Sequence, residues 1–313
     1  MDSNVNSGRA GRTLLLGSSG PLLRRLTELL VESGETVEVL LVPTGGTSSG
    51  VQRAGATLLS GDPRAMDFGL SGADYVALTE RVTRAFTVLS PVEEHDADLE
   101  RVDALRVARE LSEFVQAGGA REGITHLSTL GVFGDARSMV LESQLQVGQS
   151  FNHPLEEAAA VAELMLGRLA TRVPVRILRV GALLGDARSG ELTSHSLLGE
   201  IVRRVERSPH ISELRFKDEP LRIETTDRAA EALVILSREA RSTTVHLVDD
   251  NAPTDRRFLE WIGDRLDREF REISNSGRGR RVPSPLERLP GHERRFFAGE
   301  PLRFGRTEAL RIL

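Results

Sequence analysis

The sequence predicts a doubly wound α/β fold, in which helices cover both faces of a mostly parallel sheet and a smaller lobe follows. Over residues 12–185, short apolar runs alternate with longer segments of helical spacing. Repeated strand–helix–strand units of this size form parallel sheets. A glycine-containing turn also joins the first apolar run to the first helical segment. Ligands of such sheets bind beyond the carboxyl ends of the strands, so we expect the functional site there.

Each predicted strand is a compact apolar run, and each predicted helix repeats its apolar residues at intervals of three and four. The first helix closes at Gly34, a residue type typical of helix C-terminal caps. The predicted strands span residues 12–17, 36–42, 56–62, 84–90, 124–134, 173–185 and 245–250. The predicted helices span residues 21–34, 96–117, 154–171 and 258–266.

The chain divides into three parts by composition. Residues 1–11 are polar and rich in Gly and Ser, which predicts a disordered lead. Residues 12–185 form the predicted dinucleotide-binding-type domain, and residues 186–313 a substrate-binding lobe and docking tail that interleaves with it. Residues 186–230 look polar and irregular, whereas the last residues regain apolar spacing. We therefore expect the tail to dock back on the fold.

Composition excludes several classes of protein. A chain of 313 residues with 41 Lys and Arg against 46 Asp and Glu has a formal charge of −5, which argues against a nucleic-acid binder. The absence of cysteine excludes disulfides and thiol catalysis, and the seven scattered histidines show no metal-binding spacing. No apolar run reaches the length of a membrane span, and no signal peptide is evident. We expect a cytoplasmic protein without a metal.

The turn after the first strand carries the candidate cofactor residues Gly17, Ser18, Ser19 and Gly20. Glycines between a strand and a helix allow a pyrophosphate to approach the backbone, and the helix N-terminus attracts anions. The third glycine of this Rossmann-like fingerprint is replaced by Leu23, and overpacking of this kind typically costs about 1–3 kcal/mol unless it is relieved. The turn therefore supports the fold more strongly than it supports bound NADP or NAD.

Two further positions bear on a dinucleotide. An acidic residue at the end of the second strand would bind a ribose and a basic one a 2′-phosphate, but Val42 and Pro43 offer neither. Asp62 follows the third strand and has two interpretations. It contacts an adenine ring if a dinucleotide binds, or it is an ordinary turn aspartate.

Four segments lie in series at residues 125–135, with a Ser-Thr pair, 176–192, 221–233 and 245–253. Together they resemble the extended short-chain dehydrogenase/reductase superfamily, whose members are NAD-dependent epimerase/dehydratase-like. They look most like its thioester-reductase and fatty-acyl-CoA-reductase branch. The likeness covers roughly residues 12–270 and implies a dinucleotide cofactor and a carbonyl or thioester substrate.

Members of this superfamily carry Tyr-x-x-x-Lys on the helix after the Ser-Thr strand. The tyrosine exchanges a proton with the substrate, and the lysine lowers its pKa and holds the nicotinamide ribose. Here Leu155 occupies the tyrosine slot and Ala159 the lysine slot. The resemblance therefore implies a reductase frame without redox catalysis. The register rests on flanking matches to the family pattern at Phe151, Pro154, Ala162 and Glu163.

Four side chains are candidates for other roles at this site. Thr129 would help to orient a substrate by resemblance, or it is structural within a buried strand. His153 is either an acid or base near neutral pH or a cap of the following helix, and we favour the cap. Arg188 and His195 lie in the loop that borders the substrate by resemblance. They bind a phosphate or carboxylate, or they are exposed loop residues.

These observations leave three interpretations of function. The first is a non-redox enzyme of the cyclase, isomerase or lyase type on an acyl or polyketide-like ligand. The second is a pseudoenzyme that binds a ligand or acts as a scaffold for a partner protein or a second copy of itself. The third is an NAD(P)H-dependent reductase of a thioester or carbonyl with a relocated acid such as His153. We favour the first two because the catalytic pair is missing.

Overall fold

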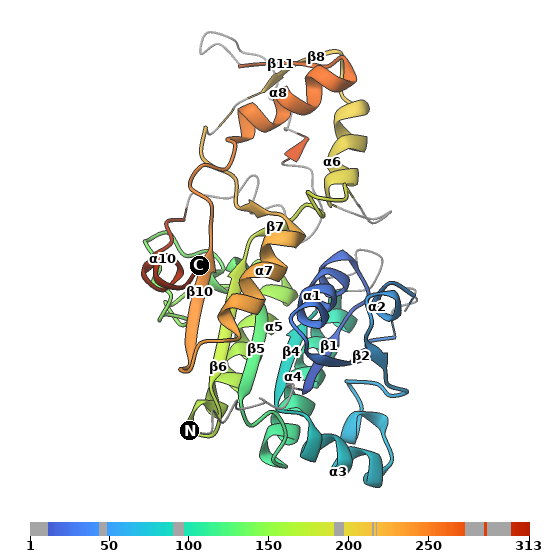
Figure 1. Ribbon diagram of the computed structural model, residues 1–313. Helices are drawn as coiled ribbons and strands as arrows, with labels where there is room; N and C mark the ends of the chain where they lie inside the picture. The colour runs from blue at the N-terminus through green and yellow to red at the C-terminus, as the bar shows by residue number, and fades with distance from the viewer. Residues whose placement is uncertain are drawn as a thin grey trace, which may run out of the picture.

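The computed structural model confirms the doubly wound α/β fold (Figure 1). Within the described residues, seven strands form one sheet in the order β10-β6-β5-β4-β1-β2-β3, and every neighbouring pair is parallel. These strands are β1 (Arg12–Gly17), β2 (Thr36–Leu41), β3 (Thr57–Leu58), β4 (Arg84–Val88), β5 (Gly123–Thr129), β6 (Val175–Val180) and β10 (Thr243–Leu247). The structure describes residues 12–43, 49–89, 97–190, 197–214, 216, 218–272, 285–286 and 302–313.

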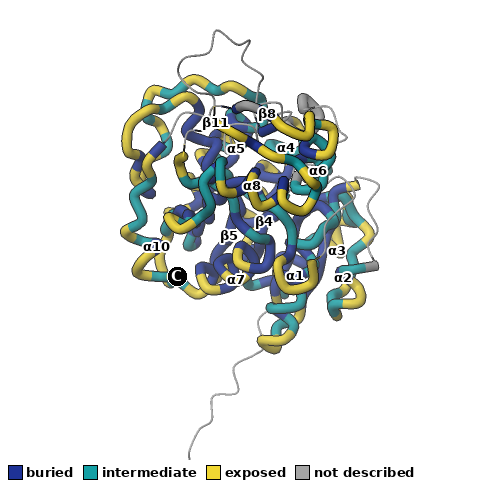
Figure 2. Tube along the Cα trace, turned by 90° about the horizontal axis from the view of Figure 1, so that it is seen from above, coloured by how far each residue is buried: buried dark blue, intermediate teal, exposed yellow. Residues whose placement is uncertain are grey.

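Helices cover both faces of this sheet. Figure 2 shows the buried strands between α4 and α5 on one side and α1 and α7 on the other. The alternation of side chains along β5 joins both layers, because Ile124 packs in the cluster beneath α4 and Leu127 in the cluster beneath α1. The helices flanking the sheet are α1 (Pro21–Glu32), α2 (Ser49–Arg53), α3 (Gly72–Arg81), α4 (Ala97–Gln116), α5 (Pro154–Gly167) and α7 (Thr226–Leu236).

A smaller lobe with its own apolar cluster stands beyond the carboxyl ends of the strands (Figure 1). Its centre includes Ile201 and Val205 from one helix and Leu259 and Ile262 from another, all almost fully buried. The expectation of irregular structure over residues 186–230 is wrong, because apolar residues at helical spacing build α6 there and an alanine-rich run begins α7. The lobe contains α6 (Leu197–Glu206), β8 (Ile211–Leu214), α8 (Asp255–Leu266) and β11 (Glu269–Glu272).

Three predicted strands are shorter than expected. The run over 124–134 forms a strand only as far as Thr129, because residues 130–133 turn into a 3₁₀ helix that the Thr129 side chain caps. The run over 56–62 keeps only two residues as β3. The run over 173–185 divides at Gly181 into β6 and the short β7 (Ala182–Leu183), which pairs with β9 (Ile223–Glu224). A Cβ at Gly181 would lie 2.0 Å from the carbonyl oxygen of Arg222, so only glycine lets the two backbones approach this closely.

The end of the chain packs against strand β10. Leu302 is buried, and α10 (Thr307–Ile312) contacts the strand along its side (Figure 1). The carboxylate of Glu142 accepts hydrogen bonds from the backbone N–H groups of Glu308, at 2.6 Å, and Ala309, at 3.0 Å. These bonds satisfy two donors that the first turn of any helix leaves open. The last residues are thus attached to the core by specific polar contacts.

Candidate functional site

The turn between β1 and α1 is tightly packed at Gly17 and open at Gly20. A Cβ at Gly17 would lie 2.4 Å from the Val88 carbonyl oxygen, which accepts the Ser18 N–H at 3.2 Å. Gly20 begins α1 with no neighbouring atom within 4 Å of an added Cβ. The first turn of α1 contains no acidic residue, and no side chain caps it. Backbone and helix dipole therefore suit an anion here.

Leu23 is accommodated at the third-glycine position without leaving the core. Its side chain is 1 % exposed and packs in the cluster between α1 and the sheet. Its Cδ1 lies 3.4 Å from the position of a Cβ on Gly17, which is ordinary contact. The helix therefore absorbs the larger residue by apolar packing, and the phosphate side of the turn stays intact.

The chain after β2 and β3 fits a dinucleotide less well than the turn after β1 does. Both carboxylate oxygens of Asp62 accept hydrogen bonds from the guanidinium of Arg64 at 2.9–3.2 Å. Val42 at the end of β2 is buried and donates its N–H to Gly17 O. An adenosine would therefore meet a carboxylate that is already paired.

Helix α5 begins with His153 as its N-cap. The Nδ1 atom of His153 accepts the N–H of Leu155 at 3.2 Å, so the ring holds the helix start. Glu156, 1 % exposed, reaches back from the first turn and accepts the Asn152 N–H at 3.0 Å. The favoured interpretation of His153 as a cap agrees with this geometry. Leu155 and Ala159 follow on the helix as half-buried apolar residues.

Thr129 closes β5 next to this helix. Its Oγ1 accepts the Gly131 N–H at 3.0 Å and caps the 3₁₀ turn η2 (Leu130–Phe133). A Cβ at Gly131 would lie 3.2 Å from that hydroxyl oxygen and 3.3 Å from Glu156 Cγ. Thr129 therefore lies beside the start of α5, as the resemblance implies, but its hydroxyl oxygen already serves the local turn.

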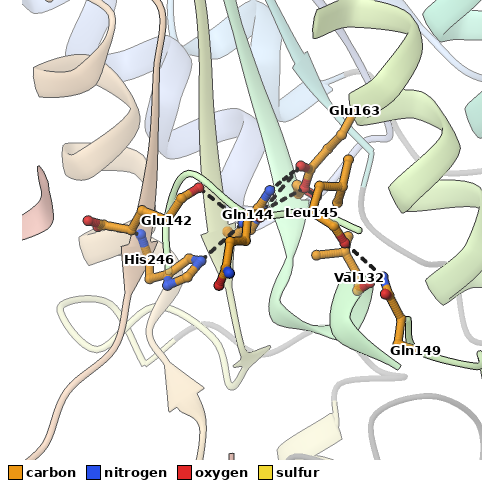
Figure 3. A network of polar contacts seen from close by, with 9 residues as sticks. Val132, Glu142, Gln144, Leu145, Gln149, Glu163 and His246 are labelled. Carbon is orange, nitrogen blue, oxygen red and sulfur yellow. Dashed lines mark hydrogen bonds and ion pairs between the residues drawn. The ribbon is translucent and has the colours of Figure 1, made fainter. Parts of the chain in front are cut away.

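A buried ion pair lies two turns further along α5 (Figure 3). Arg179 of β6 and Glu163 of α5 have side chains only 2 % and 1 % exposed. The Arg179 Nε atom lies 3.0 and 3.1 Å from the two Glu163 oxygens, and Nη2 lies 2.7 Å from Oε2. Ser128 donates its hydroxyl to Oε1 of the same carboxylate at 2.5 Å. This bidentate geometry satisfies a charge that would be costly alone.

The network continues from Arg179 to the edge of the sheet. Its Nη1 atom donates to the Gln144 carbonyl at 2.8 Å and lies 3.1 Å from His246 Nε2. His246 Nδ1 lies 3.0 Å from the Gly305 carbonyl, so this nitrogen carries the proton and Nε2 accepts from the arginine. Burial, with the charge of Arg179 added, lowers the pKa of His246 to about 3. The ring is therefore neutral.

The other predicted residues take no part in this network. Arg188 lies in an exposed turn and donates its backbone N–H to Asp186 Oδ1 at 2.9 Å. His195 and residues 1–11 lie outside the described residues. Arg179 and Arg64 are not among the site residues predicted from the sequence. A charged residue inside the apolar run 173–185 was the available signal for Arg179, because such a residue needs a buried partner.

A metal-binding cluster and a membrane-spanning helix are both absent from the described part of the chain. It contains no cluster of three or more His, Asp or Glu side chains arranged to hold a metal ion. None of its helices is both long and apolar enough to cross a membrane.

Solved structures share the fold of this chain at low sequence identity, whereas no family model and no curated protein matches it. The terminal R domain from the myxalamid PKS-NRPS biosynthetic pathway superposes with a TM-score of 0.70 at 20% identity, over 87% of this chain and 76% of its own. The reductase (R) domain of a nonribosomal peptide synthetase from Mycobacterium tuberculosis gives 0.70 at 16% identity, over 97% and 85%. UDP-glucose-4-epimerase from Stenotrophomonas maltophila, with bound NAD, gives 0.68 at 17%, over 96% and 92%. The chain therefore shares the fold of these two reductase domains and of this epimerase.

Proposed function

We propose that this protein binds a small acyl or polyketide-like molecule and acts without Tyr–Lys redox chemistry. It is a non-redox enzyme of the cyclase, isomerase or lyase type, or a pseudoenzyme that holds its ligand. One observation carries the proposal. Helix α5 has Leu155 and Ala159 at the two redox positions, while its polar side chains at His153, Glu156 and Glu163 are engaged in contacts that build the fold.

The chemistry of these contacts supports the absence of proton transfer. A general acid must reach the substrate oxygen with a proton to give. His153 uses Nδ1 to cap α5, and Glu163 is paired with Arg179. Losing a positioned acid usually removes about 10²–10⁴ of the rate, and the lysine that would hold a nicotinamide ribose is missing too. The acyl ligand class is suggested by the likeness to the two R domains.

The same likeness favours a second candidate, an NAD(P)H-dependent reductase in which His153 supplies the proton. For that role, the imidazole would have to present its other nitrogen to the substrate while Nδ1 remains the cap. A scaffold that binds a partner biosynthetic enzyme or a second copy of the chain is a third candidate. The ligand test below separates it from the first.

The test uses the octanoyl thioester of N-acetylcysteamine as probe, with and without NADPH, followed by calorimetry and by mass spectrometry of the products. Binding in the absence of NADPH, with or without conversion and with no product that depends on NADPH, supports the proposal. A product that forms only with NADPH supports the reductase. No binding and no conversion under either condition contradicts both and leaves the scaffold.

A matched pair of variants tests whether the ligand binds next to Leu155 on α5. Leu155→Trp fills the half-buried position on α5 and should weaken binding about tenfold or more by occupying the ligand's space. Leu164→Trp changes a residue of the same helix that is 39% exposed and should leave binding unchanged. Equal effects of both variants would contradict a ligand site at Leu155.

A further inference from the structure

The loop after β3 builds a cluster of charges that the proposed function does not use. Arg64 donates to Asp62 through three side-chain contacts of 2.9–3.2 Å and through its backbone N–H at 3.0 Å. Its remaining terminal nitrogen, Nη1, donates to Asp103 Oδ2 on α4 at 2.8 Å. One guanidinium thus binds two carboxylates and ties the loop to the neighbouring helix. Bidentate pairs of this kind combine strength with a fixed geometry.

The loop that presents Asp62 is held in one conformation. Asp67 and Phe68 have φ angles of 52° and 57°, a left-handed conformation that residues other than glycine rarely adopt. Phe68 is fully buried and packs on the rings of Tyr75 and Phe114 at 5.9 and 5.4 Å. Its carbonyl accepts the Asp62 N–H at 2.9 Å. This buried aromatic anchor therefore fixes the position of the Asp62 backbone.

This cluster lies where a nucleotide base would bind in the fold. The first strands and helices of a doubly wound sheet form one mononucleotide-binding half, with the phosphates at the first turn. Asp62 follows β3 in that half. Leu59, directly after β3, donates its N–H to the Val39 carbonyl of β2. An adenine amino group would need an acceptor here, and a ring nitrogen would need an N–H. The acceptor would be the Asp62 carboxylate, which is already paired with Arg64, and Pro63 has no N–H to donate.

We infer that Arg64 closes the base subsite, so that this half of the fold does not select adenine. The turn has no atom within 4 Å of an added Cβ at Gly20, whereas the carboxylate on the base side is paired with an internal guanidinium. The pairing is strong at neutral pH. Burial opposes the charge of Asp62, but the hydrogen bonds from Arg64 outweigh it and hold the pKa of the carboxyl below its usual value.

The inference is independent of the acyl ligand proposed above, because its test uses nucleotides alone. Calorimetry compares ADP-ribose with inorganic pyrophosphate for the wild type, Arg64→Ala and Arg64→Gln. The wild type should bind ADP-ribose no more than a few-fold tighter than pyrophosphate, or bind neither. Each variant that folds should gain about tenfold or more for ADP-ribose, because a freed carboxylate accepts a charge-assisted hydrogen bond. Pyrophosphate binding should not change.

Arg81→Ala is the matched control. Arg81 forms the same bidentate pair with Glu38, at 2.9–3.1 Å, and its side chain is 29% exposed against 24% for Arg64. Arg81 ends α3 and pairs with β2, not with the loop after β3, so its removal should give no gain. Selective wild-type binding of ADP-ribose, no gain in Arg64→Ala or Arg64→Gln, or an equal gain in Arg81→Ala would each overturn the inference. None of these results bears on whether an acyl thioester binds.

Discussion

Helix α5 carries two regions of opposite chemistry within two turns. Near its start, Leu155 and Ala159 occupy the positions where the family resemblance places a tyrosine and a lysine, so neither position offers a proton donor or a cation. Further along, Glu163 joins Arg179 and Ser128 in a buried network that extends to His246. The position of this helix and its reaction chemistry therefore depend on different residues. Its position in the fold depends on the buried ion pair, and its reaction chemistry would depend on two side chains that are absent.

The two regions also differ in what a substitution costs the fold. A buried charge is costly unless its partner is present, so the Glu163–Arg179 pair is difficult to lose one residue at a time. The half-buried positions of Leu155 and Ala159 accept an apolar side chain without leaving a charge unpaired. An apolar residue at either position therefore need not disturb the buried network. Three measurements test this separation, from the largest expected effect to the smallest.

Breaking the network should give the largest loss of stability. Glu163→Gln removes the negative charge that pairs with Arg179 in a site where both side chains are at most 2 % exposed. Leaving a buried charge uncompensated typically costs about 3–5 kcal/mol, and urea denaturation measures this loss. The double variant Glu163→Leu/Arg179→Met removes both charges and should recover most of it. A change below about 1 kcal/mol in Glu163→Gln would show that the pair does not hold α5.

Acid should weaken the fold through its neutral buried histidines. Burial lowers the pKa of His126 to about 4, and burial with Arg179 lowers that of His246 to about 3, against 6.5 for an ordinary histidine. Between pH 6.5 and 4 the unfolded chain takes up protons that the folded chain does not. The free energy of unfolding therefore falls as pH falls, by about 1.4 kcal/mol per pH unit for each histidine, and the full contribution is present above pH 6.5.

The variant His126→Leu isolates one of these two contributions. It removes the histidine beneath α4 and α5 that lies outside the network, bonded to Thr87. The slope of unfolding free energy against pH, measured by urea denaturation and averaged from pH 7 to pH 5, should decrease by about 1 kcal/mol per pH unit. An unchanged slope would mean that His126 is protonated in the folded protein.

Removing the cap of α5 should have the smallest effect. His153→Ala deletes the acceptor for the Leu155 N–H, and loss of an N-cap costs about 0.5–2 kcal/mol. Thr254→Ala removes the corresponding cap of α8 in the lobe and should lose a similar amount. If His153→Ala is as stable as the wild type while Thr254→Ala is not, the cap made by His153 does not stabilise α5.

The sequence predicts the sheet well because its signals are local. The first strand ends at Gly17 as expected, and each of the other six predicted strands overlaps a strand of the sheet. The assignment of Leu155 and Ala159 to redox positions comes from the family resemblance and stays a prediction. Residues 186–230 are predicted wrongly because α6 is only ten residues long and polar sequence flanks it, although its apolar residues lie at helical spacing.

The side-chain networks could not be predicted from local pattern. Ser128, Glu142, Glu163, Arg179 and His246 come from separate segments and meet only in the folded chain. The pairing of Arg64 with Asp62 is close in sequence but depends on the left-handed loop that follows it. Nothing in the residue types of that loop specifies a left-handed conformation at Asp67 and Phe68. Its buried aromatic packing does so.

Deuteride transfer tests the central claim most directly. NADPH carrying deuterium at the transferable position is incubated with the wild-type protein and the octanoyl thioester of N-acetylcysteamine, and mass spectrometry follows the label. With Leu155 and Ala159 at the redox positions, we expect no deuterium in any product. A deuterated aldehyde or alcohol that disappears in His153→Ala would contradict the account and assign the proton to the cap of α5.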